Sequence, residues 1–180
     1  MNFFDDIKDY NYKYIVSDII ENSEFRKLDD IKHHGGSRLQ HSLKVSYYSY
    51  LIAKALRLDY EATARAGVLH DFYFERTKEK KRAIDKVKLF STGHPKDAVT
   101  NASFLFNLSD KEKDIIKAHM FPIDYRIPKY VESWIVSFVD KAVSFKEFGT
   151  KFNYQLSTTL NYQLSTTLNI WLLLLINLKK

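Results

Sequence analysis

The chain has 180 residues, of which 45% are hydrophobic and 28% charged, and its formal net charge is +6. This composition is ordinary for a globular domain with a core of its own. The absence of cysteine excludes disulfides and thiolate metal sites, so any metal must be held by imidazole and carboxylate groups, which suit Fe, Mn, Co, Ni or Zn. The positive charge fits an anionic substrate, but the signs are mixed along the chain, so we expect no specific nucleic-acid partner.

Few glycines and prolines (5 and 3), together with frequent helical spacing of apolar residues, predict an all-α fold. We expect a short amphipathic helix within residues 10–30 and a loop at residues 33–36. Ser37 and the glutamine three residues later have the form of a capping box, so a helix should begin there and run to about Leu56. Its apolar residues predict that it is buried on most sides, with His41 on an inward face near its start.

The next predicted helix runs from Tyr60 to His70 and begins after an N-cap at Asp59. Its small residues permit close helix packing. Gly67 costs about 1 kcal/mol relative to alanine inside a helix, so we expect a neighbouring helix to approach closely there. Asp71 follows His70 directly at the end of this apolar stretch. A buried carboxylate is costly without a partner, so Asp71 should face one.

Two further predicted helices carry histidines at their ends. His94 precedes Pro95, which suits the first turn of a helix. The second helix begins with a capping box at Ser109 and Glu112 and carries His119 near its C-terminal end, where the helix dipole also favours a histidine. Each histidine alone fits an ordinary structural position, and only their combination makes them candidate ligands.

Pro128 is predicted to open the most apolar helix, and Asp140 lies within it. A carboxylate there requires a cation, either an arginine in a salt bridge or a metal. Lys141, the next residue, should point elsewhere on the helix. Residues 72–90 begin aromatic and turn strongly basic, which fits either a solvated loop or a basic lip that attracts phosphates.

Residues 153–160 and 161–168 are identical octapeptides, which predicts a segment outside the packed domain. The apolar run at residues 170–176 is too short to span a bilayer, which requires about 20 residues, so we expect no transmembrane segment. This run could pack on the domain, on a second copy in a homodimer, or weakly at a membrane surface. The acidic residues 1–6 lack the basic start and apolar run of a signal peptide, so the expected location is the cytoplasm.

Five segments carry histidine and aspartate in the order H…HD…H…H…D. They are Arg38–Val45 (RLQHSLKV), His70-Asp71, Gly93-His94-Pro95, residues 117–120 and residues 135–141. Over about residues 33 to 146 this pattern resembles the HD superfamily of metal-dependent phosphohydrolases, and it uses four of the six histidines. The two histidines after the doublet resemble the two-metal branches, and the short single-domain form is most similar to the bacterial diadenosine tetraphosphate hydrolases.

The resemblance implies a single HD-domain helical bundle with a buried site for two divalent ions. One ion would be held by His41, His70, Asp71 and Asp140, and the other by Asp71, His94 and His119, with Asp71 as the bridge. The expected organisation is an N-terminal helical segment packed on the domain (1–32), the HD domain (33–146) and a tail (147–180).

The resemblance also implies catalytic roles for Asp71, Arg38 and Lys141. Arg38, one turn before His41, is suited to bind a phosphate oxygen in a bidentate manner. Many family members continue the doublet with Ile-Gly-Lys, in which the lysine helps to hold a phosphate. Here residues 72–74 are Phe-Tyr-Phe, so Arg76 or Lys78 would have to bind the substrate in its place.

The expected activity is hydrolysis of a phosphate ester or anhydride of a nucleotide-type substrate by metal-activated water. One alternative is a nucleoside monophosphate phosphatase, which would need the second metal less. Another is a non-catalytic metal- or nucleotide-binding regulator, which the complete ligand set argues against and the altered residues after the doublet faintly favour. A further alternative, a nucleic-acid-binding protein, is supported only by the positive net charge. His33 and His34 either line the substrate cleft or belong to an ordinary loop.

Overall fold

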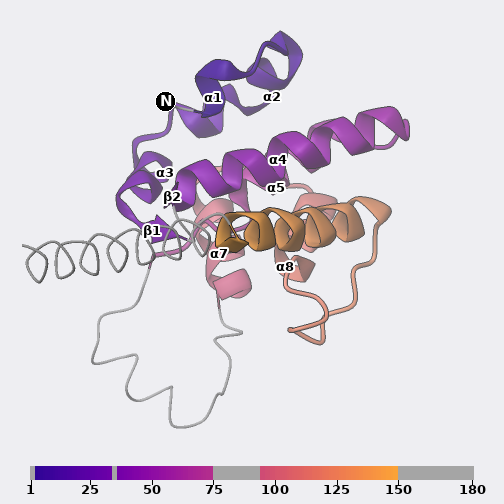
Figure 1. The fold of residues 1–180 in the computed structure, drawn as a ribbon. Coiled ribbons are helices and arrows are strands. Elements are labelled where there is room, and N and C mark those ends of the chain that lie inside the picture. The colour runs from indigo at the N-terminus through magenta and orange to yellow at the C-terminus, as the bar shows by residue number, and fades with distance from the viewer. Residues whose placement is uncertain (1–2, 34–35, 75–93, 150–180) are drawn as a thin grey trace, which may run out of the picture.

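The computed structural model describes residues 3–33, 36–74 and 94–149, which form a helical bundle with one small two-stranded sheet (Figure 1). In chain order its elements are α1 (Phe3–Asp6), α2 (Tyr10–Ile20), α3 (Ser23–Arg26), the 3₁₀ helix η1 (Lys27–Asp30), β1 (Lys32–His33), β2 (Gly36–Ser37), α4 (Arg38–Ala55), α5 (Tyr60–Leu69), α7 (His94–Leu105), α8 (Asp110–Ala118) and a helix over residues 131–149. The prediction of an all-α fold is confirmed. The basic segment with Arg76 and Lys78, and the duplicated tail, lie outside the described residues.

Helices α4 and α5 pair closely at the centre of the bundle, because small residues face each other across their contact. A Cβ atom added at Gly67 of α5 would lie 2.8 Å from the Cα atom of Ser46 in α4, so the site has no room for a methyl group. Ser46 Oγ donates a 2.6 Å hydrogen bond to the carbonyl of Ala64 and accepts one of 2.9 Å from the hydroxyl of Tyr12. The close approach predicted at Gly67 is therefore confirmed.

Side-chain caps begin the main helices at the predicted residues. The N-caps are Ser37 for α4, Asp59 for α5, and Ser109 for α8, where Glu112 completes a capping box. Gln40 Oε1 accepts a 3.0 Å hydrogen bond from the backbone N–H of Phe3, which ties α1 to the first turn of α4. Since each cap satisfies backbone N–H groups that lack a partner inside the helix, these residues fix where the helices start.

Three local details differ from the prediction. Residues expected in a plain loop form β1 and β2, which pair antiparallel with Lys32 opposite Ser37. Pro128 does not open the last helix, which begins at residue 131, where the carbonyl of Tyr130 accepts a 3.4 Å hydrogen bond from the N–H of Trp134. The second half of α4 is less buried than expected, since its apolar residues Leu51 and Ile52 are exposed.

The N-terminal helices share the hydrophobic core of the bundle. Tyr12 and Val16 of α2 and Phe25 of α3 are fully buried in the same cluster as Leu43 of α4 and Leu69 of α5. The last helix runs without interruption past residue 146, where the sequence predicts that the domain ends. Within the ranges that the structure describes, no helix combines the length and the apolar character needed to cross a bilayer.

Candidate metal centre

Four helix ends and the middle of the last helix bring all six predicted ligands into one cluster. His41 lies in the first turn of α4, His70 and Asp71 follow α5, His94 begins α7, His119 caps α8, and Asp140 lies in the helix over residues 131–149. Among the described residues, three groups have ligand atoms within 4.8 Å of one another: His33, His41 and Asp71; His41, His70 and Asp140; and His70, Asp71 and His119. The groups overlap, so they form one continuous site.

Asp71 lies between the two halves of this site and turns one carboxylate oxygen toward each. Its Oδ1 atom is 3.6 Å from Nε2 of His94 and 3.5 Å from Nε2 of His119. Its Oδ2 atom is 3.8 Å from Nε2 of His70 and 3.8 Å from Nε2 of His33. The two oxygens of Asp71 therefore face different pairs of histidines.

Asp140 completes the first set. Its Oδ1 atom lies 3.1 Å from Nε2 of His41 and 3.6 Å from Nε2 of His70. Burial alone would raise the pKa of both site carboxylates, but the surrounding histidines outweigh it and hold the pKa values of Asp71 and Asp140 below the usual range. Both groups are therefore negatively charged and suited to bind a cation.

Backbone carbonyls orient two of the imidazole rings. Nδ1 of His70 donates a 2.8 Å hydrogen bond to the carbonyl of Gly67, and Nδ1 of His119 donates one of 2.7 Å to the carbonyl of Ile116. With Nδ1 bound to a backbone carbonyl, Nε2 of each ring faces the site, and this is the nitrogen that can bind a metal. In the second set, the Nε2 atoms of His119 and His94 are only 3.1 Å apart.

Two buried atoms of the cluster make no hydrogen bond within the part of the chain that the structure describes: Nε2 of His70 and Oδ1 of Asp71. Leaving such a group unsatisfied costs about 1–3 kcal/mol. A divalent ion would satisfy both atoms, and imidazole with carboxylate suits Fe, Mn, Co, Ni or Zn. The residues present therefore fit a metal centre.

Glu147 is a site residue that sequence reasoning missed. Its Oε2 atom lies 3.0 Å from Nδ1 of His41, and its Oε1 atom accepts a 2.7 Å hydrogen bond from Nζ of Lys44. Burial would lower the pKa of His41, but Asp140 and Glu147 together raise it to about 9. A signal was available, because Glu147 lies two helical turns after Asp140 and so on the same face of the helix.

Lys141 does not point toward Asp140 but supports another ligand. Its Nζ atom donates hydrogen bonds of 2.8 Å to the carbonyl of His119 and of 3.0 Å to both the carbonyl and the hydroxyl of Ser137. It thereby joins the end of α8 to the last helix. The contacts are those of a residue that positions His119.

Arg38 is only 2% exposed, and its guanidinium group is held by Tyr73. Nη1 donates a 2.7 Å hydrogen bond to the carbonyl of Tyr73, Nη2 donates one of 3.0 Å to its hydroxyl, and Cζ lies 3.9 Å from the ring centroid. The same ring packs against His94 with centroids 4.9 Å apart. Tyr73 therefore fixes the orientation of the guanidinium group, and a phosphate bound by Arg38 would share this group with Tyr73.

The fold and site define an all-α protein whose helices converge on a histidine–aspartate cluster that could hold a metal. The family model of the HD domain matches residues 38–143, which is more than half of the chain, and the chain therefore belongs to the HD domain family. This confirms the resemblance to the HD superfamily. No curated protein sequence matches the chain. The family match includes all six predicted ligands and leaves His33 and Glu147 outside.

Proposed function

We propose that the protein is a phosphohydrolase with two divalent ions that cleaves a phosphate ester or anhydride of a nucleotide-type substrate. Membership of the HD domain family supports metal-dependent phosphohydrolysis in general. The two-ion assignment rests on the orientation of the Asp71 carboxylate. Its Oδ1 atom faces His94 and His119, whereas its Oδ2 atom faces His70.

In this proposal the residues His41, His70, Asp71 and Asp140 hold one ion, and Asp71, His94 and His119 hold the other. A pair of such ions lowers the pKa of bound water and neutralises charge that builds on phosphoryl oxygens.

The chain's own residues prepare the site for this chemistry. Glu147 fixes the ring of His41, and Lys141 holds the backbone of His119. The carboxylates of Asp71 and Asp140 remain charged in a buried setting.

A nucleotide-type substrate is supported by the aromatic rings beside the cluster. Tyr73 lies two residues after the doublet and contacts His94, and its neighbour in the chain, Phe74, is 39% exposed. Such rings can stack on a nucleobase. Phosphate contacts are assigned to Arg38, and to Arg76 or Lys78 in the segment outside the described residues. The proposed setting is the cytoplasm, where nucleotides are abundant.

The test is a hydrolysis panel with protein purified without air and loaded separately with Fe, Mn, Co, Ni or Zn. The substrates are diadenosine tetraphosphate, nucleoside mono- and triphosphates, and a cyclic dinucleotide. We expect metal-dependent release of phosphate or nucleotide, absent in Asp71→Asn. Symmetrical cleavage of the dinucleotide tetraphosphate to two diphosphates would support similarity to those hydrolases, whereas activity on monophosphates alone would favour a nucleoside monophosphate phosphatase.

A second candidate is a non-catalytic metal- or nucleotide-binding regulator. It is favoured by the contact between Arg38 and Tyr73, in which both terminal nitrogens of the guanidinium group donate to Tyr73. Protein that binds metal and nucleotide but hydrolyses no member of the panel would support this candidate and contradict the enzyme.

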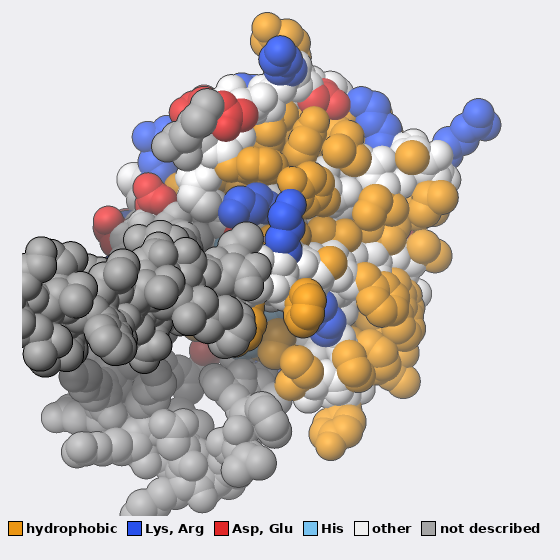
Figure 2. Space-filling model, viewed as in Figure 1, with side chains coloured by type: hydrophobic (Ala, Val, Ile, Leu, Met, Phe, Trp, Pro, Cys, Tyr) orange, Lys and Arg blue, Asp and Glu red, His pale blue; other side chains and the backbone are white. Residues whose placement is uncertain are grey.

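We also propose that a second copy of the chain packs against the helix over residues 131–149. Figure 2 shows many hydrophobic side chains exposed on the face in view. On this helix Val131, Phe138, Phe145 and Phe148 are exposed, and their spacing of seven and three residues places them on one stripe. Such spacing is typical of helix–helix pairing. Light scattering should give a dimer mass that Phe138→Glu reduces to that of a monomer.

A further inference from the structure

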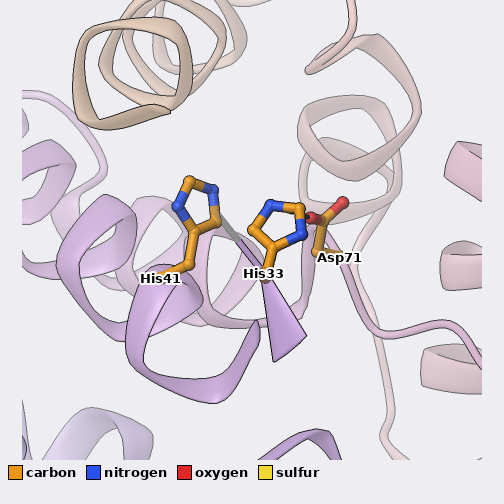
Figure 3. A group of neighbouring side chains, drawn as sticks. All are labelled: His33, His41 and Asp71. Atoms are coloured by element: carbon orange, nitrogen blue, oxygen red, sulfur yellow. Dashed lines mark ion pairs between the residues drawn. The ribbon is translucent and has the colours of Figure 1, made fainter. Parts of the chain in front are cut away.

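His33 faces the metal centre, although it lies in β1 and outside the segment that matches the HD domain (Figure 3). Its Nε2 atom is 3.8 Å from Oδ2 of Asp71, and its ring centroid is 4.7 Å from that of His41. One ligand atom from each of these three residues lies within 4.8 Å of the others. His33 therefore belongs to the same cluster as the predicted ligands.

The chain holds His33 in place through the start of α4. Strand β1 pairs with β2 so that His33 lies opposite Gly36, and the N–H of Arg38 donates a 2.9 Å hydrogen bond to the carbonyl of Ile31. Ser37 belongs to β2 and is also the N-cap of α4. The position of His33 is thus coupled to the helix turn that carries His41.

The distances place His33 with the first ligand set. It faces Oδ2 of Asp71, which is the oxygen that also faces His70, whereas Oδ1 faces the other set. A separation of 3.8 Å is too long for a hydrogen bond. It is compatible with two ligands of one ion, since metal–nitrogen and metal–oxygen bonds are each about 2.0–2.2 Å. With 18% of its side chain exposed, against 1% for His41, His33 lies at the outer edge of this set.

We propose that His33 is an additional ligand of the first ion, beside His41, His70, Asp71 and Asp140. The inference rests on the proposed metal centre and deepens it. Three imidazoles with two carboxylates select a transition metal over Mg²⁺ or Ca²⁺, which prefer oxygen ligands. The partial exposure of His33 also predicts that a small external ligand can reach its position when the side chain is removed.

The experiment compares His33→Ala and His33→Gln with Lys32→Ala, which changes the exposed neighbour on the same strand. Each protein is loaded with Co²⁺, and its visible spectrum, metal content and affinity against a competing chelator are measured. We expect both His33 variants to change the spectrum and to bind one ion about 10–100-fold more weakly, by analogy with the loss of other metal-site partners. Lys32→Ala should match the wild type, and added imidazole should restore the wild-type spectrum of His33→Ala.

Unchanged spectra and affinities in both His33 variants would overturn the ligand assignment. If their hydrolysis fell at the same time, His33 would act on the substrate instead. The spectra and affinities can be measured without turnover. Wild-type protein that binds Co²⁺ but hydrolyses nothing would therefore contradict the proposed function, while the spectra would still decide whether His33 is a ligand. Wild-type protein that binds no Co²⁺ would contradict both.

Discussion

Glu147 and His41 meet across the site, with Oε2 of the carboxylate 3.0 Å from Nδ1 of the ring, although 106 residues separate them. The contact joins the end of the last described helix to the start of α4. Metal-binding histidines commonly donate their second N–H to a carboxylate, which fixes the ring and makes it a stronger ligand. Lys44 balances the charge of Glu147 at 2.7 Å.

Replacing Glu147 with glutamine should weaken metal binding while leaving the fold intact. The neutral amide still accepts a hydrogen bond, but it no longer stabilises positive charge on the metal-bound ring, so we expect a loss of about 10–100-fold in affinity. Chelator competition measures this loss, and circular dichroism checks the fold. The exposed Glu61→Gln is the matched control, and equal affinities for the two variants would contradict the role of Glu147.

Asp71→Asn should abolish the binding of at least one ion and all metal-dependent hydrolysis. An amide cannot present two anionic oxygens to two ligand sets, as the carboxylate of Asp71 does. Metal content by mass spectrometry and the hydrolysis panel measure both effects. Full metal content together with full activity would show that the site assignment is wrong.

Removal of metal should lower the melting temperature of the wild type by more than that of Asp71→Asn, which has lost at least one ion. A ligand that binds only the folded state adds about 2.7 kcal/mol at a concentration 100-fold above its dissociation constant. Thermal unfolding with and without a chelator measures the difference. An equal shift in both proteins would mean that the stabilising metal binds outside this site.

Arg38→Lys should destabilise the protein by roughly 1–3 kcal/mol and reduce turnover while metal stays bound. An ammonium group cannot reproduce the two directed hydrogen bonds and the ring contact that the guanidinium makes with Tyr73. Tyr73→Phe removes only the hydroxyl bond and should have a smaller effect. Urea unfolding measures the loss of stability in each variant, and metal analysis checks that metal stays bound. A larger loss of stability in Tyr73→Phe than in Arg38→Lys would contradict the prediction.

Gly67→Ala should destabilise the contact between α4 and α5. The new methyl group would lie 2.8 Å from a backbone atom of Ser46, and such overpacking costs about 1–3 kcal/mol, against a gain of about 1 kcal/mol in helix propensity. Gly149→Ala is the control, since a Cβ atom there meets nothing within 4 Å. Urea unfolding should show a loss for the first variant and no loss for the second.

The sequence by itself determined the helical class, the N-caps at Ser37, Asp59 and Ser109, and the order of the six candidate ligands. These features are local: a cap acts within one turn, and the histidine–aspartate pattern is a property of spacing along the chain. The close approach at Gly67 could also be predicted, because a glycine inside a helix lowers helix stability and this cost is a local property of the sequence.

Only the tertiary structure decided which side chains support and extend the site. The sequence left two interpretations open for His33, expected Arg38 to face a phosphate, and assigned residue 147 to a tail. In the folded chain His33 approaches Asp71, Arg38 binds Tyr73, and Glu147 binds His41. Each of these contacts joins segments that are distant in sequence, and the packing of whole helices sets the distance between such segments. No local pattern of residues encodes that distance.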